Sequence, residues 1–353
     1  MERDPQLVLG VMSGTSCDGL DLALCLFSEL NGRWHFEVLQ AVTLPYDHAL
    51  RQQLSSAHTL GAAELIRFDR AFGRYIGDQV KVFLGDDAGR VSLISSHGHT
   101  VFHSPKEGYS FQIGHGAAIA AATGIDTICD LRSTDVALGG EGAPLVPLGD
   151  ALLFPEADIC LNLGGFANLS YDDAGRRVAF DVCPVNLPIN ALCARLGLAF
   201  DRDGDIARSH QPDSRLLSSL ERIYGQERPS LSREWIESHL DPLIDSSELS
   251  AEVLIATITE HAARKLAATL DTLPGRTVLC TGGGAFNAFL IERIGALTQN
   301  QIMVPAREVV EFKEAIIWAF LGHLAYNKRV NVLSSYTGAA HDSVAGGLYR
   351  GTY

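Results

Sequence analysis

The chain has 353 residues, of which 46% are hydrophobic and 20% are charged, and its formal net charge is −14. This length exceeds the size at which one hydrophobic core stops growing, so we expect two domains. A nucleic-acid groove needs a basic face, and the 28 Lys and Arg residues form no dense cluster, which argues against a nucleic-acid partner. Local backbone donors can still bind an anionic nucleotide in an acidic protein.

The sequence contains no run of apolar residues near the ~20 that span a bilayer. Its first residues, Met-Glu-Arg-Asp-Pro, lack the basic stretch and long apolar segment of a signal peptide. The seven cysteines are scattered and form no CxxC pair, which is typical of a reducing compartment. We therefore expect a cytoplasmic protein without a membrane partner.

The first half of the chain is predicted to open with three strands and to continue with helices that alternate with single strands. Apolar runs and the turn signal Asn31-Gly32 indicate this order. We expect strands at residues 7–12, 20–27 and 34–43, helical structure over 48–86, a strand at 91–96, a helix at 114–123 and a strand at 127–129.

A second round of the same kind is predicted from about residue 158. The Gly/Pro-rich stretch 130–147 before it is interpreted as a linker or hinge. The repeat predicts two α/β domains of like topology, and ligand sites are common in the clefts at domain interfaces. We expect strands at 159–163, 167–171 and 177–182, helices that include 254–270, a strand at 277–281, a helix from about 285 and a helix over 314–326.

Glycine-rich turns follow predicted strands at three places. The first runs from Gly10 to Asp21 and combines glycines, hydroxyls and two carboxylates. Backbone N–H groups in such a nest suit phosphate oxygens, and a nearby Asp can hold magnesium through water. An ordinary polar hairpin turn fits the same residues. Gly164-Gly165 repeats the design, and Gly282-Gly283-Gly284 follows a strand and opens a helix.

Three further candidates each have a structural alternative. Asp181 ends a strand before a proline-containing loop, where it could act as a base or cap a turn. Glu314 is expected in the first turn of its helix, where a carboxylate favours the helix dipole. Arg132 could bind a carboxylate in a forked pair, or form a salt bridge with Asp130 or Asp135.

Histidines form the strongest rival signal. His97 and His99 have the His-x-His spacing of a strand that holds a metal ion, and His103 follows them. Asp130 or Asp181 could complete such a site. The same histidines and Thr100 could instead hydrogen-bond a polyhydroxylated ligand, so both interpretations stay open at this point.

These segments together resemble the anhydro-N-acetylmuramic acid kinases from Gly10 to about Tyr349. The resemblance implies a two-domain α/β fold of the actin, hexokinase and Hsp70 type, which is a duplicated ribonuclease H-like fold with ATP in the interdomain cleft. On this basis we assign residues 1–130 and 331–353 to the first domain and residues 131–330 to the second. The most specific matches are Met12-Ser13-Gly14-Thr15-Ser16, Asp18-Gly19, Asp21, Ser96-His97-Gly98, Thr100, Gln112-Ile113-Gly114, Gly139-Gly140, Gly142-Ala143-Pro144-Leu145-Val146-Pro147, Asn162-Leu163-Gly164-Gly165-Phe166-Ala167-Asn168, Gly282-Gly283-Gly284-Ala285-Phe286-Asn287 and Thr337-Gly338-Ala339.

The resemblance also implies roles for single residues. Asp181 matches the catalytic base, Glu314 matches an acidic residue near the phosphates, and Asp18 is the candidate magnesium ligand. The residues expected to face the sugar are His97, His99, Thr100 and Arg132. The residues expected to bind ATP are Gly14, Thr15, Ser16, Cys17, Asp18, Gly19, Leu20, Asp21, Gly164, Gly165, Gly282, Gly283 and Gly284.

The reaction that the resemblance implies opens the 1,6-anhydro bridge of the sugar with water and phosphorylates O6. The product is N-acetylmuramic acid 6-phosphate, a step in cell-wall recycling, and the implied partners are ATP, Mg2+, the sugar and a second copy of the chain. The chain departs from the family pattern where the sugar is expected, at His99, Ser133, Thr134, Cys183 and Val185. The alternatives are a kinase for another anhydro sugar such as levoglucosan, a His-liganded metallohydrolase, and a non-catalytic ATP-switched binding module.

Overall fold

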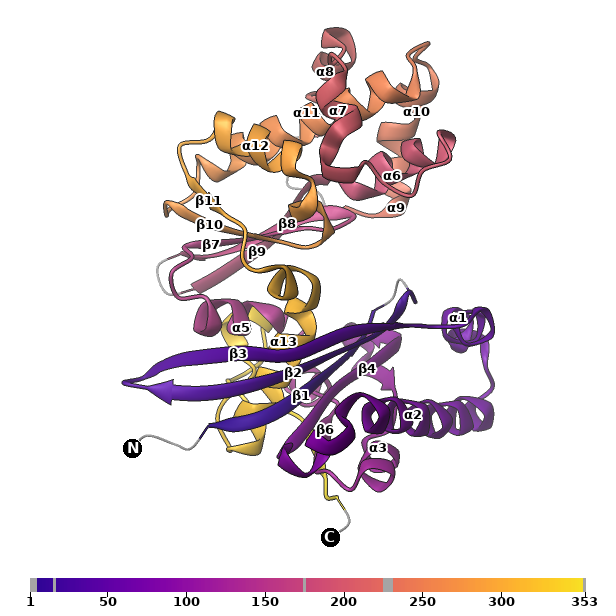
Figure 1. Cartoon of the computed structure of the whole chain (residues 1–353), viewed down its shortest axis with the longest axis vertical. Coiled ribbons are helices and arrows are strands. Elements are labelled where there is room, and N and C mark those ends of the chain that lie inside the picture. The colour runs from indigo at the N-terminus through magenta and orange to yellow at the C-terminus, as the bar shows by residue number, and fades with distance from the viewer. Residues whose placement is uncertain (1–4, 15–16, 174–175, 225–230, 352–353) are drawn as a thin grey trace. The chain divides into compact units, whose positions relative to one another are not determined.

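The structure is a computed structural model that describes residues 5–14, 17–173, 176–224 and 231–351 (Figure 1). The chain divides into two compact units: unit 1 is Met1–Pro155 with Phe312–Tyr353, and unit 2 is Glu156–Glu311. Residues 131–155 and 312–330, which the sequence analysis assigned to the second domain, thus belong to unit 1. Among the described residues, no helix is long and apolar enough to cross a membrane.

Unit 1 is built around a seven-stranded sheet, counted over its described residues. Strands β1, β2 and β3 form an antiparallel meander, and β4 and β6 add to the other side of β1 as parallel strands. Strand β12 closes the edge beside β6, and β5 pairs with β4. The elements are β1 (Gln6–Ser13), β2 (Gly19–Leu30), β3 (Arg33–Pro45), α1 (His48–Ser55), η1 (Ala57–Thr59), α2 (Ala62–Leu84), η2 (Gly85–Arg90), β4 (Leu93–Ser104), η3 (Pro105–Glu107), β5 (Tyr109–Ile113), α3 (Gly116–Thr123), β6 (Thr127–Cys129), α4 (Ser133–Ala137), α5 (Val146–Leu153), α14 (Ser334–Thr337) and β12 (Gly347–Tyr349).

Unit 2 repeats this topology. Its strand order, β9–β8–β7–β10–β11, matches β3–β2–β1–β4–β6 of unit 1 in order and in the pattern of antiparallel and parallel pairs. The prediction of a duplicated ribonuclease H-like α/β fold is therefore confirmed. The elements are β7 (Ile159–Leu163), β8 (Phe166–Asp173), β9 (Arg176–Pro184), α6 (Asn186–Arg195), η4 (Arg202–Gly204), α7 (Asp205–Ser209), α8 (Ser214–Leu220), α9 (Arg233–Trp235), the π-helical turn η5 (Ile236–Leu240), α10 (Asp241–Asp245), α11 (Ala251–Leu270), β10 (Thr277–Thr281), η6 (Gly283–Phe286), α12 (Ala288–Leu297) and β11 (Gln301–Met303).

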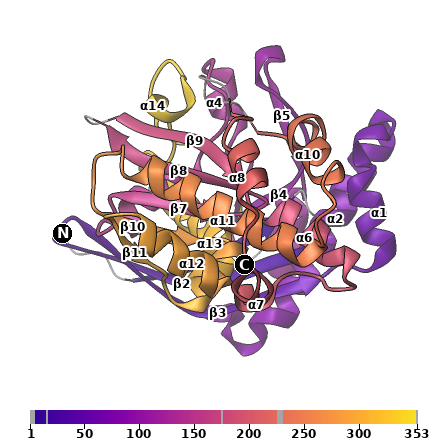
Figure 2. The same cartoon turned by 90° about the horizontal axis from the view of Figure 1, so that it is seen from above.

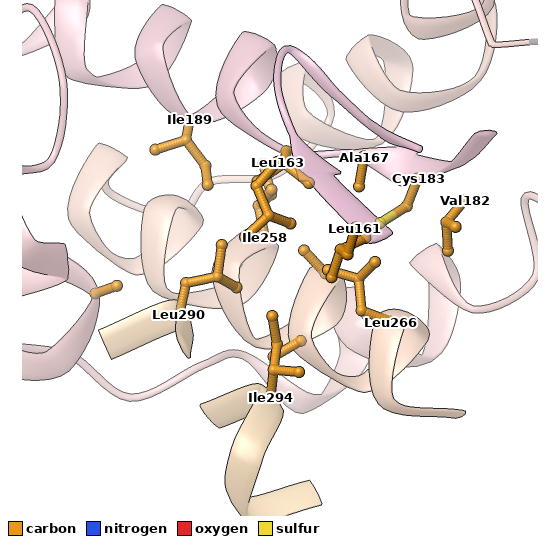
Figure 3. Packing of buried hydrophobic residues seen from close by; sticks show 14 of the residues in the cluster. Leu161, Leu163, Ala167, Val182, Cys183, Ile189, Ile258, Leu266, Leu290 and Ile294 are labelled. Atoms are coloured by element: carbon orange, nitrogen blue, oxygen red, sulfur yellow. The ribbon is translucent and has the colours of Figure 1, made fainter. Parts of the chain in front are cut away.

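The cores of the two units follow from the same layering of helices on a sheet. In unit 1, α2 lies beside α3 (Figure 1), and the apolar face of α2 packs against β1, β2 and β4. In unit 2, α11 and α12 lie side by side (Figure 2). Figure 3 shows Leu161 and Leu163 of β7 among Ile258 and Leu266 of α11 and Leu290 of α12.

Helix α13 (Arg307–Tyr326) lies very close to the sheet of unit 1. A Cβ at Gly10 of β1 would overlap the carbonyl oxygen of Ala315, so only glycine permits this approach. Ser95 of β4 donates a hydrogen bond of 2.6 Å to the carbonyl of Trp318, and Gly322 faces the same serine without a side chain. These contacts explain why residues 312–330 belong to unit 1.

The interpretation of residues 130–147 as a linker is wrong, because an internal hydrogen-bond network folds this segment into unit 1. The buried carboxylate of Asp135 accepts from the Gly142 amide at 2.8 Å and from the Thr337 hydroxyl at 2.6 Å. The Glu141 amide donates to the Thr337 carbonyl at 2.8 Å. The Gly-rich segment is therefore joined to the C-terminal Thr337-Gly338-Ala339 motif.

A second buried carboxylate holds the end of the chain. Asp126 accepts hydrogen bonds from the Arg350 guanidinium at 2.6 Å, the Gly351 amide at 2.9 Å and the Tyr326 hydroxyl at 3.0 Å. Burial raises the pKa of Asp126, but these donors outweigh that effect and lower it overall. Arg350 and Gly351 are thus fixed beside the start of β6 and the end of α13.

Some element boundaries differ from the predicted ones. The helical stretch 48–86 is interrupted between α1 and α2, where Gly61 is the N-cap residue of α2. Strand β4 continues to Ser104 and forms an unpredicted hairpin with β5. Helix α13 begins at Arg307, so Glu314 lies in its second or third turn rather than its first.

We expect Gly10→Ala to destabilise the protein by about 3 kcal/mol, because the added methyl overlaps the backbone of α13. Gly89→Ala is the matched control, since its Cβ would meet no atom within 4 Å. That control should change the free energy of unfolding by less than about 0.5 kcal/mol. Urea unfolding measures both, and equal stability of the two variants would contradict the close approach of α13.

Candidate functional site

The predicted site residues follow the carboxyl ends of parallel strands in both units. In unit 1, the first glycine loop follows β1, and Arg132 follows β6. His97 and His99 lie in the middle of β4, where its parallel pairing with β6 and β1 ends. In unit 2, Gly164 follows β7 and Gly282 follows β10. The carboxyl edge of parallel strands is where α/β sheets bind ligands.

The two glycine turns of unit 2 lie against each other. Strands β7 and β10 pair in parallel up to Asn162 and Thr281, so their turns leave the sheet side by side. Gly282 has φ +79°, and a Cβ there would lie 2.5 Å from Asn162 Oδ1. A Cβ at Gly283 would meet only the Asn186 amide, at 3.8 Å, which leaves this peptide open to a ligand.

A cavity of about 610 Å³ adjoins the second turn. Its size fits a nucleoside, and two aromatic rings, Phe200 and Phe286, give it apolar walls. The Arg307 guanidinium lies 4.8 Å from the centre of the Phe286 ring. The lining residues are Asn186, Ile189, Asn190, Phe200, Asp201, Arg202, Asp203, Gly283, Gly284, Phe286, Asn287 and Arg307. The cavity thus includes two of the three glycines predicted to contact the nucleoside.

Asp181 lies on β9 beside the first turn of unit 2. Its carboxylate is half-buried and accepts a hydrogen bond of 3.2 Å from the Leu231 amide. Burial raises the pKa of Asp181, and the Leu231 amide partly opposes this rise. The chain then returns to the turn, because the amides of Val185 and Asn186 donate to Gly165 and Gly164. A carboxylate with a raised pKa at this position is suited to accept a proton.

The departures at Cys183 and Val185 lie in the core of unit 2. Both side chains have no exposed surface and belong to the apolar cluster of β7, α6 and α11. Figure 3 shows Cys183 in this cluster. These two departures from the family pattern therefore fill space beneath the loop. Their side chains do not line the surface beside Asp181.

The first glycine loop of unit 1 is described only in part, since Thr15 and Ser16 lie outside the described residues. The Cys17 amide donates to the Gly14 carbonyl at 3.1 Å, which closes the loop. Leu20 is fully buried in the core, so its side chain anchors the loop and does not face a ligand. Its backbone lies opposite Ser13 of β1 and Leu44 of β3, and its contact with ATP stays a prediction.

Carboxylates gather near this loop. Asp21 accepts a hydrogen bond of 2.6 Å from Thr43, while Asp18 is exposed and lies 3.7 Å from Arg51. Burial raises the pKa of Asp21, and the charges of Glu314 and Asp18 raise it further, although Thr43 opposes the shift. The charges of these carboxylates therefore repel one another beside the loop.

The Glu314 side chain is solvent-accessible, but the protein that surrounds it displaces water and so raises the pKa of its carboxyl group. The cations of Lys313 and Arg132 act in the opposite direction, and Asp150 adds to the rise. Lys313 itself forms a buried ion pair of 3.2 Å with Asp150 of α5. Because α13 begins seven residues earlier, the helix-dipole explanation of Glu314 is wrong.

Arg132 is held from three sides. It donates to Nε2 of His97 at 3.2 Å and 3.0 Å and to the Gly142 carbonyl at 2.6 Å, and it lies 5.2 Å from the Trp318 ring centre. Because Arg132 only donates, Nε2 of His97 accepts, and Nδ1 carries the proton that it gives to the Gly98 carbonyl at 3.0 Å. Burial and the Arg132 charge lower the pKa of His97 to about 3.

The remaining histidines do not assemble a metal site. His99 is buried and hydrogen-bonds Ser13, and His103 pairs with Ser110 at 3.0 Å. Within the described ranges, no group of three or more His, Cys, Asp and Glu side chains could hold a metal ion. The metallohydrolase alternative is therefore not favoured.

A smaller polar cavity of about 130 Å³ lies beside His97 in unit 1. Next to it, Gln112 donates to the hydroxyls of Ser110 at 2.8 Å and Thr100 at 3.3 Å. The lining residues are Asp69, His97, Gly98, Ser110, Phe111, Gln112, Ile113, Gly114, His115, Cys129, Asp130, Ser133 and Tyr349. Neutral donors and acceptors of this kind suit sugar hydroxyls.

Two sheets of one topology, each with glycine turns at its carboxyl edge, define the fold class as a duplicated α/β fold. The chain belongs to the anhydro-N-acetylmuramic acid kinase family, whose model matches residues 6–351. An anhydro-N-acetylmuramic acid kinase of Shewanella denitrificans is 33% identical over 371 residues, which cover 98% of each chain. One of Pseudomonas paraeruginosa is 35% identical over 373 residues, covering 97% of this chain and 98% of that protein.

Among solved structures, the activator of 2-hydroxyisocaproyl-CoA dehydratase from Clostridium difficile with bound ADPNP superposes with a TM-score of 0.45. It is 14% identical, and the match covers 92% of this chain and 97% of that one.

Sequence reasoning missed several residues that shape the site. Asn186 bridges the two turns of unit 2 by donating to the Leu163 carbonyl at 3.0 Å. Phe200 and Arg307 line the large cavity, and Tyr46 reaches the first loop. Of these residues, only Asn186 could have been found from the sequence, because it ends the loop that follows Asp181. The others come from distant segments with no motif.

His97 is expected to make the protein less stable in acid. Its folded-state pKa of about 3 lies below the ~6.5 of an unfolded histidine, so below about pH 6.5 only the unfolded chain takes up the proton. As the pH is lowered below about 6.5, His97 alone should therefore reduce the free energy of unfolding by up to about 1.4 kcal/mol per pH unit.

Urea unfolding at pH 7.5 and 5.0 checks this prediction. His97→Gln should reduce the loss of stability over this interval by about 2 kcal/mol. His58→Gln, at an exposed histidine, serves as the control and should keep the wild-type loss. If His97→Gln and His58→Gln behave alike, the neutral state of His97 is refuted.

Proposed function

We propose that the protein is an ATP-dependent kinase that opens 1,6-anhydro-N-acetylmuramic acid with water and phosphorylates O6. The observation that carries this proposal is the match to the kinase family over almost the whole chain. Supporting it, the predicted phosphate turns and the candidate base lie at the carboxyl edges of the sheets.

Asp181 would start the reaction by taking a proton from water. The water oxygen bonds to the anomeric carbon, and the bond from that carbon to O6 breaks. A carboxylate acts as a base in its ionised form. The raised pKa of Asp181 makes that form a stronger acceptor for the proton of the water. The proton remains on Asp181 until it is released to solvent.

The electron pair left on O6 then forms a bond to the γ-phosphorus, and the bond to the departing ADP oxygen breaks. Backbone amides of the glycine turns would bind the phosphate oxygens. Mg2+, held by Asp18 and Asp21, would neutralise charge on the phosphates. Glu314 would complete the acidic group beside them.

Arg132 would recognise the lactyl carboxylate of the sugar. Its contacts with His97 and Gly142 fix the guanidinium. The terminal nitrogens Nη1 and Nη2 each keep a hydrogen that can be donated to an acceptor. Burial lowers the pKa of Arg132 only to about 10, so it stays charged at neutral pH. Thr100 and the polar cavity beside His97 would contact neutral groups of the sugar.

Asp181→Asn should lower kcat by about 1000-fold or more while leaving the affinity for ATP nearly unchanged, because it removes only the proton acceptor. Coupled ADP release measures turnover, and isothermal titration measures ATP binding. Asp245→Asn makes the same change at an exposed carboxylate of unit 2 and should keep full activity. Full activity of Asp181→Asn would reject the assigned base.

Labelled water tests the ring-opening step. With H2(18)O, one heavy oxygen should appear at the anomeric position and none in the phosphate ester, because O6 comes from the sugar. If the label is absent from the product, phosphorylation does not pass through hydrolysis. If only another sugar such as levoglucosan is turned over, the proposed substrate is wrong.

Arg132→Gln should lower kcat/KM by about 10- to 100-fold for the sugar with a lactyl carboxylate, because a charge-assisted pair is lost. It should affect 1,6-anhydro-N-acetylglucosamine, which has no carboxylate, much less. Steady-state kinetics with both sugars make the comparison. An equal loss on both would show that Arg132 does not recognise the carboxylate.

A further inference from the structure

His99 lies beneath the first glycine loop, and a sugar can reach almost none of it. Its side chain is 3% exposed, and Nδ1 lies 3.3 Å from the Ser13 hydroxyl. The preceding Gly98 has φ +73°, and a Cβ there would overlap the Ile113 carbonyl oxygen. At this bend the pairing of β4 with β1 shifts, so that Ser13 comes opposite His99. The glycine therefore turns the imidazole toward the loop.

Tyr46 reaches the same serine from the end of β3. Its hydroxyl donates to Ser13 at 2.8 Å, and its amide donates to the Asp18 carbonyl at 3.3 Å. Burial raises the pKa of Tyr46, so the phenol keeps the proton that it donates. Because Ser13 accepts from Tyr46, its own proton is available to His99. The carbonyls of Gly14 and Leu54 interact with the His99 ring as well.

Arg51 of α1 holds the far side of the loop. Its Nε donates to the Cys17 carbonyl at 3.1 Å, and its charge lies 3.7 Å from Asp18. Cys17 has φ +55°, a conformation that side-chain-bearing residues seldom adopt and that neighbouring contacts must maintain. The loop is thus attached at Ser13, Cys17 and Asp18.

We propose that His99, Tyr46 and Arg51 form a brace that holds Ser13, Cys17 and Asp18 of the first glycine loop in the arrangement that binds nucleotide phosphates. The three are positioning residues that act through the loop, and His99 is not a sugar ligand. Ordering backbone costs conformational entropy, and residues that are ordered before binding avoid that cost. This inference rests on the proposed role of the loop in binding ATP.

The test compares ATP affinity with sugar KM at saturating ATP. His99→Leu should weaken ATP binding about 10-fold, and Tyr46→Phe and Arg51→Gln about 3- to 5-fold, which are the sizes expected for one or two lost hydrogen bonds. His99→Gln keeps a donor and an acceptor and should restore affinity to within about 3-fold of wild type. Sugar KM should change less than 2-fold throughout.

Tyr109→Phe is the matched control, because its hydroxyl donates to the exposed Glu107 and touches no loop residue. It should bind ATP as wild type does. If His99→Leu does not fold, Tyr46→Phe and His99→Gln decide the question, since both preserve volume.

Three results would overturn the brace while wild type still binds ATP. The first is a higher sugar KM with unchanged ATP affinity, and the second is no change in either quantity. The third is an equal weakening of ATP binding and of sugar binding, together with a lower melting temperature. Failure of wild type itself to bind ATP would instead reject the proposed function, and the brace with it.

Discussion

The contact between helix α13 and strand β1 determines where the polar groups of unit 1 can lie. Gly10 lets the helix backbone touch the strand, and the hydrogen bond from Ser95 to Trp318 fixes its rotation. With the helix held in this way, Trp318 lies under Arg132, and the charge of Glu314 acts on both Arg132 and Asp21. A helix displaced by one side-chain layer would separate these groups.

The two units share a topology but use it with different chemistry. Unit 2 presents backbone groups to a ligand. Its turns are packed so tightly that Gly282 and Gly284 have no space for a side chain. Unit 1 offers charged and polar side chains, namely Arg132, the carboxylates of β2 and α13, and the hydroxyls and amide of β4 and β5. A neutral histidine suits this setting, because His97 can accept from Arg132 only while it is unprotonated.

Much of the architecture could be predicted from the sequence because strand periodicity and glycine turns are local signals. The meanders of both units and the strands β7 and β10 lie close to where they were expected. The linker interpretation was wrong because the partners of Asp135 include Thr337, about 200 positions away, which no local pattern reveals. For the same reason, the sequence alone gave no reason to place Tyr46 and Arg51 at the first glycine loop.

The chain order of unit 1 has a consequence for synthesis. Unit 2 is continuous, whereas unit 1 needs both its first 155 residues and the segment from Phe312 onward. Gly10 and Ser95 receive their helix, and Asp126 receives Arg350, only after all of unit 2 has been translated. The later-encoded unit 2 can therefore complete its core on the ribosome first, while the earlier-encoded sheet still lacks α13, and transiently exposed apolar surface of this kind is prone to aggregation.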